Sequence, residues 1–271
     1  MGTASDFGDE WLSYSGLKMQ VDGGMTLRTA DMRDSYPDEP GYHGTVVVSQ
    51  DRLNQLVAIA NRYGWRVGTH AVGDGAIDKI LDAYAYADRE RSIRDRRFIV
   101  IHGSLMHPDQ MERAKALGVR VDTQSVFLWD KAATIARYLG KATADRAIPL
   151  RWLIDHMGLN AVAQGTDYPI NTLNPFVNMY IMVTRKDING TVYGADQAVT
   201  REEALRLYTS AASWYSFSEH KIGSIEPGKL ADLAILSDDP LAVAESELKN
   251  IVVLRTLVAG RTVFTLGSYQ K

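Results

Sequence analysis

The sequence has 271 residues, of which 45% are hydrophobic, so the chain can bury a substantial core. Its net charge of -3 lacks the basic excess that nucleic-acid-binding proteins carry. No window approaches the run of about 18 apolar residues that a membrane span requires. We therefore expect neither nucleic acid nor a membrane as a partner.

The absence of cysteine bounds the chemistry further. It excludes disulfides, thiolate metal sites and cysteine nucleophiles, so any metal must be held by His, Asp, Glu or a modified Lys. Residues 1–14 carry Asp6, Asp9 and Glu10 and contain no apolar stretch, which is unlike a signal peptide. Together these features predict a cytoplasmic protein.

Short apolar strands alternate with amphipathic helices from residue 16 to about 215. The expected strands are 17–21, 65–72, 98–102, 119–124 and 161–166, with a weaker candidate at 45–49. Three segments between them repeat apolar residues at helical spacing: Leu53, Leu56, Val57 and Ala60; Ile77, Ile80, Leu81 and Tyr84; Leu150, Leu153, Ile154 and Met157. This alternation predicts parallel strands joined by helical crossovers.

Two expected helix starts and a change in the hydrophobic pattern after residue 220 complete the expected secondary structure. A helix is expected to begin at Pro108, and Thr200 with Glu203 forms a capping-box pattern. After residue 220 the pattern changes to strands at 232–236 and 253–264, the latter interrupted by a turn at Gly260. We therefore divide the chain into an α/β domain, 1–220, and a small β-sandwich-type segment, 221–271.

A parallel α/β core can be an open sheet or a closed barrel. No G-x-G-x-x-G run follows any expected strand, which disfavours a nucleotide-binding open sheet. Ionisable residues recur at the carboxyl ends of the strands, where (β/α) barrels keep their chemistry. Five clear strands fall short of the eight that take about 250 residues, so we predict a TIM-like barrel that lacks its first strands. Unpaired sheet edges would favour a homo-oligomer.

Four ionisable residues lie within or just after the expected strands: Lys18, His70, His102 and Asp167. Taken singly, a strand-end His or Asp is more often structural, and an isolated Lys is usually a solvated surface group. Consecutive parallel strands, however, direct their carboxyl ends to a common mouth. Two imidazoles and a carboxylate there predict a site for a divalent metal, zinc foremost, that activates water.

Several runs of residues match a known family. They are KMQVDG at 18–23 with RTA at 28–30, THAVGDGA at 69–76, IH at 101–102, GTDYP at 165–169 and IGSIEPGKLADL at 222–233. The chain resembles the amidohydrolase superfamily, specifically the branch that contains N-substituted formamide deformylases. The resemblance runs through nearly the whole sequence.

The resemblance implies roles for the four residues. Lys18 lies where the family has a lysine that can be carboxylated and bridge two metals. His70 and His102 match ligands of one of those metals, and Asp167 matches the carboxylate on the last barrel strand, which acts as ligand, general base or both. The implied reaction is attack of hydroxide on an amide or formamide carbon, with Asp167 carrying the proton and one or two metal ions holding the oxyanion. The implied partner is a small amide-type substrate.

Other residues have less specific roles. Arg28, Gln124 and Trp129 are substrate-binding candidates, although each could equally be a surface, core or rim residue. Ser125 stands where the family favours proline. Asp74 is expected to cap a helix that starts at Gly75. The remaining histidines are expected to be structural or exposed: His43, His107, His156 and His220.

One departure leaves the function open. Members of the family carry a His-x-His pair on the first barrel strand, and no such pair occurs in this sequence. The leading interpretation is a metal-dependent amidohydrolase, and the alternative is an inactive amidohydrolase fragment that acts as a binding or assembly module. An unrelated barrel for phosphate-bearing substrates is disfavoured, since the strand–helix turns lack a phosphate cradle.

Overall fold

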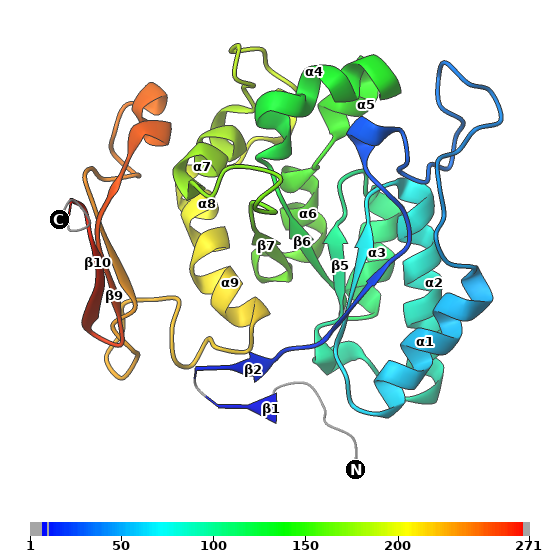
Figure 1. Ribbon diagram of the computed structural model, residues 1–271, viewed down its shortest axis with the longest axis horizontal. Helices are drawn as coiled ribbons and strands as arrows, with labels where there is room; N and C mark the ends of the chain where they lie inside the picture. The colour runs from blue at the N-terminus through cyan, green and yellow to red at the C-terminus, as the bar shows by residue number, and fades with distance from the viewer. Residues whose placement is uncertain (1–6, 10, 268–271) are drawn as a thin grey trace.

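The computed structural model describes residues 7–9 and 11–267. Much of the N-terminal segment 1–14, which the sequence distinguished from a signal peptide, therefore lies outside the described residues. A five-stranded parallel sheet forms the centre, with strand order β3-β4-β5-β6-β7 (Figure 1). The strands are β3 (Leu17–Gln20), β4 (Val67–Ala71), β5 (Ile99–His102), β6 (Arg120–Thr123) and β7 (Val162–Gln164). All five expected strands are confirmed, each shortened by one to three residues.

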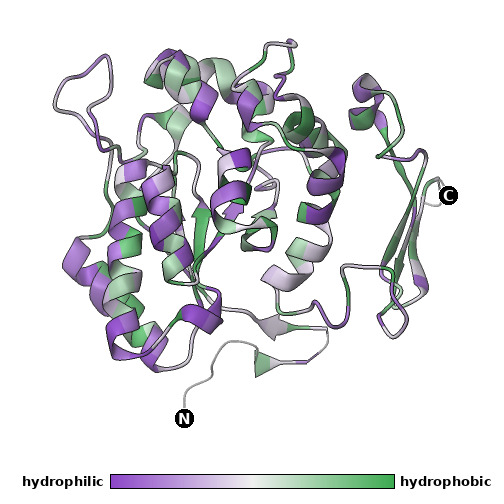
Figure 2. Ribbon diagram, turned by 180° about the vertical axis from the view of Figure 1, so that it is seen from behind, coloured by the Kyte–Doolittle hydropathy of each residue, from purple (hydrophilic) through white to green (hydrophobic). Residues whose placement is uncertain are grey.

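Helices connect the strands; most of them pack along the sheet, and the two that directly follow β6 lie above the carboxyl ends of the strands (Figure 1). The helices are α1 (Gln50–Arg62), α2 (Asp74–Glu90), α3 (Pro108–Ala116), α4 (Phe127–Leu139), α5 (Lys141–Arg146), α6 (Leu150–Met157), α7 (Pro175–Thr184), α8 (Arg201–Tyr208) and α9 (Ser210–Tyr215). Alternate strand residues such as Val67, Val100 and Val121 are fully buried in the core shared with these helices. Figure 2 shows hydrophobic residues on the central strands and many hydrophilic residues on the surrounding helices.

The opposite face of the sheet is only partly covered. Lys18 pairs with Gly68, and two residues further along the strands Gln20 pairs with His70, which in turn pairs with Ile101. Lys18 and Gln20 are exposed and His70 is half-buried, as expected for residues whose side chains project from the face opposite the helices. Within residues 7–9 and 11–267, β3 and β7 end the sheet, so the barrel is not closed.

Two local expectations differ from the structure. Residues 45–49 form no strand: the Val47 N–H donates to the Val21 carbonyl at 2.8 Å, and the chain then turns so that Ser49 can cap α1. Asp74 is the first residue of α2 rather than its cap, and Gly73 takes the capping position. A Cβ on Gly73 would lie 2.0 Å from the Asp31 carbonyl oxygen, so glycine allows this close approach.

The C-terminal segment forms a separate layer beside α7 and α8 (Figure 1). Strands β8 (Leu233–Leu236), β9 (Val253–Val258) and β10 (Arg261–Thr265) make an antiparallel sheet, with the expected turn at Gly260 between the last two. The capping box of Thr200 and Glu203 is confirmed at the start of α8. A short hairpin, β1 (Phe7–Gly8) with β2 (Ser13–Tyr14), precedes the central sheet. None of the helices described combines the length and apolar character needed to cross a membrane.

Candidate metal centre

Two histidines meet at the carboxyl end of neighbouring strands. His70 lies near the end of β4 and His102 is the last residue of β5. Their ring centroids are 4.4 Å apart, and Nδ1 of His70 lies 2.9 Å from Nε2 of His102. His102 is 4% exposed and has a φ of 76°, an unusual backbone conformation for a residue with a side chain. The fold therefore brings together two of the four residues that the sequence indicated as ligands.

In each ring one nitrogen faces the other histidine, the inner nitrogen, and one points away from it, the outer nitrogen. The hydrogen bond of the outer nitrogen determines whether the inner nitrogen carries a proton. Nε2 of His70 lies 3.0 Å from the Gly23 carbonyl oxygen, and Nδ1 of His102 lies 2.6 Å from Oε1 of Gln124. These oxygens can only accept, so both outer nitrogens donate their N–H. A neutral imidazole has one N–H, which leaves two lone pairs facing each other between the rings. A shared cation satisfies both lone pairs, so the residues present fit a divalent metal.

Burial keeps both rings neutral. It lowers the pKa of His70 and that of His102. A charge on the neighbouring His70 would lower the pKa of His102 further, because it would repel a second charge. Neutral imidazole is the form that binds a metal ion. The electrostatics thus favour ligand chemistry over acid–base chemistry at neutral pH.

This shift predicts a pH-dependent stability for the metal-free protein. The pKa of His102 is lower in the folded than in the unfolded chain, so below about pH 6.5 only the unfolded chain takes up the proton and stability falls as pH falls. Between pH 6.5 and 5, we expect the unfolding free energy to fall more steeply for wild type than for His102→Asn, by up to about 1.4 kcal/mol per pH unit. Urea unfolding of both proteins, with His156→Asn as control, measures the difference. Parallel curves for wild type and His102→Asn would contradict it.

A buried carboxylate fixes the loop that supplies the Gly23 carbonyl. Asp22 is fully buried, and its carboxylate accepts hydrogen bonds from the backbone N–H groups of Val72 at 3.0 Å, Asp31 at 2.9 Å and Gly73 at 2.8 Å. Its Oδ1 also lies 3.6 Å from Nε2 of His70. Asp22 therefore holds the loop after β3 against the turn after β4.

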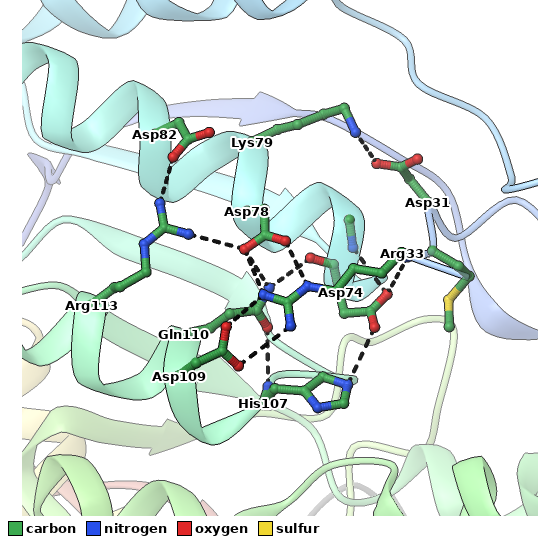
Figure 3. A network of polar contacts seen from close by, with 12 residues as sticks. Asp31, Arg33, Asp74, Asp78, Lys79, Asp82, His107, Asp109, Gln110 and Arg113 are labelled. Carbon is green, nitrogen blue, oxygen red and sulfur yellow. Dashed lines mark hydrogen bonds and ion pairs between the residues drawn. The ribbon is translucent and has the colours of Figure 1, made fainter. Parts of the chain in front are cut away.

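A polar network anchors the far end of the same loop (Figure 3). Arg33 pairs with Asp78 of α2 and with Asp109 of α3, each at 2.7 Å. Lys79 pairs with Asp31 at 2.6 Å. These contacts join the loop to two helices, so the position of the Gly23 carbonyl depends on segments far apart in the sequence.

The histidine pair opens into a cavity of about 240 Å³. Asp167 lines the same cavity from the loop after β7, where its φ is 56°. The other walls are mainly apolar: Met25, Leu27, Val72, Phe127 and Ile170. The cavity thus joins two imidazoles and one carboxylate in an apolar setting.

The remaining predicted ligand lines a different cavity, although its charge acts on the pKa of both histidines. Lys18 is exposed on β3 and lines a second cavity, of about 190 Å³, with Arg66 and Tyr215. Over the described ranges, no group of three or more His, Asp or Glu side chains is arranged to hold a metal. The structure therefore brings His70 and His102 into contact, places Asp167 at their cavity and leaves Lys18 outside it.

The three substrate-binding candidates have other partners. Arg28 pairs with Asp38 and Glu39, each at 2.9 Å. Gln124 is buried against His102, and Trp129 packs edge-on to Tyr180 with ring centroids 6.1 Å apart. These three residues are not among those lining the histidine cavity. Their role in substrate binding stays a prediction.

Sequence reasoning missed three contributors to the site. Asp22 and Gly23 lie in the KMQVDG run at 18–23 that carried the family resemblance, but neither was assigned a role. Phe127 lines the cavity and its ring centroid lies 6.1 Å from that of His102. Phe127 follows the substrate-binding candidate Gln124 by three residues, and this closeness in the sequence was the one feature that could have indicated its role.

A histidine pair at the carboxyl ends of parallel strands lies where (β/α)-barrel enzymes keep their active sites, and imidazoles there suit a divalent metal. The structure is similar to that of an uncharacterized metal-dependent hydrolase from Pyrococcus horikoshii OT3, with a TM-score of 0.78 and 29% identity over 90% of this chain and 48% of that one. The profile of the amidohydrolase family matches residues 1–264, and the chain belongs to that family.

Curated proteins with similar sequences are longer than this chain. The chain is 32% identical to an N-substituted formamide deformylase of Arthrobacter pascens, over 80% of this chain and 40% of the relative. It is 30% identical to the protein LONG AFTER FAR-RED 3 of Arabidopsis thaliana, over 94% of this chain and 44% of the relative. The chain therefore spans less than half the length of these relatives.

Proposed function

We propose that this chain carries the metal-binding site of a hydrolase that cleaves amide- or formamide-like C–N bonds. The observation that carries the proposal is the 2.9 Å approach of Nδ1 of His70 to Nε2 of His102, with a hydrogen-bond acceptor oxygen beside the other nitrogen of each ring. Membership of the amidohydrolase family and the similarity to a formamide deformylase support the bond type.

The chain's own residues have distinct parts in this proposal. His70 and His102 would hold a divalent ion, zinc foremost, and Lys18 is the further ligand that the family resemblance implies. When bound, the ion would supply Lewis-acid activation of water and of the substrate carbonyl. The Asp167 carboxylate would accept a proton from the attacking water and return it to the leaving amine. The apolar walls would hold the carbon groups of the substrate and exclude bulk water.

A second candidate function has one observation in its favour. Lys18 lies outside the cavity, and the described His, Asp and Glu side chains form no group of three that could hold a metal. Two imidazoles alone make a weaker site than the three protein ligands usual in catalytic zinc sites. This favours a chain that binds metal, or a partner, without catalysis.

One experiment separates the two functions. The purified chain is titrated with zinc and assayed for amine release from a panel of N-substituted formamides and N-acyl amines. Under our proposal, turnover requires zinc, stops with a chelator and returns when zinc is restored. Zinc binding without turnover across the panel would favour the inactive module, and no zinc binding at all would overturn the metal centre.

A further inference from the structure

The side-chain amide of Gln124 lies between His102 and Asp122. Its Oε1 is 2.6 Å from Nδ1 of His102. Its Nε2 donates to two oxygens of Asp122, the carboxylate Oδ1 at 3.1 Å and the backbone carbonyl at 3.2 Å. Gln124 is 4% exposed, so water does not compete freely for these bonds.

The two oxygens of Asp122 determine which way the Gln124 amide points. A turned amide would place Oε1 against a carbonyl and a carboxylate, two groups that only accept when the carboxylate is ionised. The observed orientation avoids that repulsion and directs Oε1 to His102. The backbone beside it is also fixed, because the Ser125 N–H donates to Oε1 of Gln164 at 3.1 Å.

We propose that Gln124, oriented by Asp122, is a positioning residue that sets the tautomer of His102. The contact requires Nδ1 of His102 to carry the proton, and Nε2 is then free to present its lone pair toward Nδ1 of His70. Asp122, Gln124 and His102 form a chain of hydrogen bonds that begins on the open face of the sheet and ends at the histidine pair. This inference rests on the proposed function, since a fixed tautomer matters most where Nε2 binds a metal.

The inference changes what Gln124 is expected to do. A substrate-binding residue would face the cavity and alter the affinity for substrate. Gln124 instead contacts the ring nitrogen that points away from the partner histidine, so it acts through His102. Outer hydrogen bonds of this kind typically change metal affinity by about 10- to 100-fold.

The test compares the tautomer of His102 in metal-free proteins by two-bond ¹H–¹⁵N spectra of ¹⁵N-histidine-labelled chains, with a His102→Asn spectrum to assign the signals. In wild type we expect Nδ1 of His102 to be protonated. Gln124→Leu should abolish that preference and weaken zinc binding by about 10- to 100-fold. Asp155→Asn, which removes a largely exposed carboxylate of α6, should change neither.

A double variant provides the rescue. In Gln124→Glu/Asp122→Asn the side-chain donor and acceptor are exchanged: the amide introduced at position 122 can donate to the carboxylate introduced at position 124, whose other oxygen accepts from His102. The contact with the backbone carbonyl of residue 122 is lost in this variant, and the donation from the new amide has to outweigh the repulsion between that carbonyl and the carboxylate. We expect this variant to restore both the Nδ1-protonated tautomer and the zinc affinity, even where Gln124→Leu folds poorly. An unchanged His102 pattern in folded Gln124→Leu, or a double variant that lacks the Nδ1 proton, would overturn the inference. Because the spectra need no metal, a wild-type chain that binds no zinc would count against the proposed function alone.

Discussion

Replacing both His70 and His102 by alanine is expected to abolish divalent-metal binding. Among the described residues that line the cavity, these two imidazoles are the nitrogen ligands, and the single remaining carboxylate cannot replace them. Wild type should retain about one zinc per chain after incubation and desalting, and the double variant none. Metal content by mass spectrometry gives the result directly, and any zinc-dependent amide hydrolysis should disappear with it.

A matched double variant makes this result specific. His43→Ala/His156→Ala removes two histidines outside the cavity, and His156 pairs with Glu112 at 2.8 Å on the surface. That protein should bind zinc like wild type. Equal zinc content in wild type and in His70→Ala/His102→Ala would place the metal elsewhere and refute the proposed centre.

The second large effect is expected at Asp167. Its carboxylate lines the cavity of the histidine pair, and its charge acts on the pKa of both rings. Asp167→Asn keeps the size of the side chain but removes the proton acceptor, so we expect turnover to fall by about 10²- to 10⁴-fold. Zinc content should remain, because both imidazoles are untouched. Steady-state rates and metal content of the same preparation test the two statements together.

The outcomes at Asp167 distinguish its two family roles. Loss of turnover with zinc retained assigns the carboxylate as the proton acceptor, whereas loss of both assigns it as a ligand. Full turnover in Asp167→Asn would exclude either role. Asp130→Asn, which removes a largely exposed carboxylate paired with Lys131, serves as the control.

Much of the fold was predictable because its signals are local. The strands of the central sheet are short apolar or alternating segments, and each confirmed helix repeats apolar residues every three to four positions. The capping box at Thr200 needs only four consecutive residues. The segment 45–49 misled because its apolar residues also suit an extended link, and such a short run carries no information about whether a neighbouring strand will pair with it.

The candidate site was predictable in part. His70 and His102 come together because neighbouring parallel strands align their carboxyl ends, a rule that applies to any such pair. The position of Lys18 was not predictable in the same way. It lies two residues before the end of β3, and whether a residue there reaches the mouth depends on the register and on the cover over the sheet's open face.

Local patterns were therefore sufficient for the strands, the class of metal ligand and the two histidines, because each depends on residue type and short-range spacing. The loop after β3 and the state of the histidine rings required contacts between distant segments. Gly23 meets His70 across 47 residues, and Gln124 meets His102 across 22. Which ring nitrogen carries the proton follows from those partners, and no pattern within either strand specifies them.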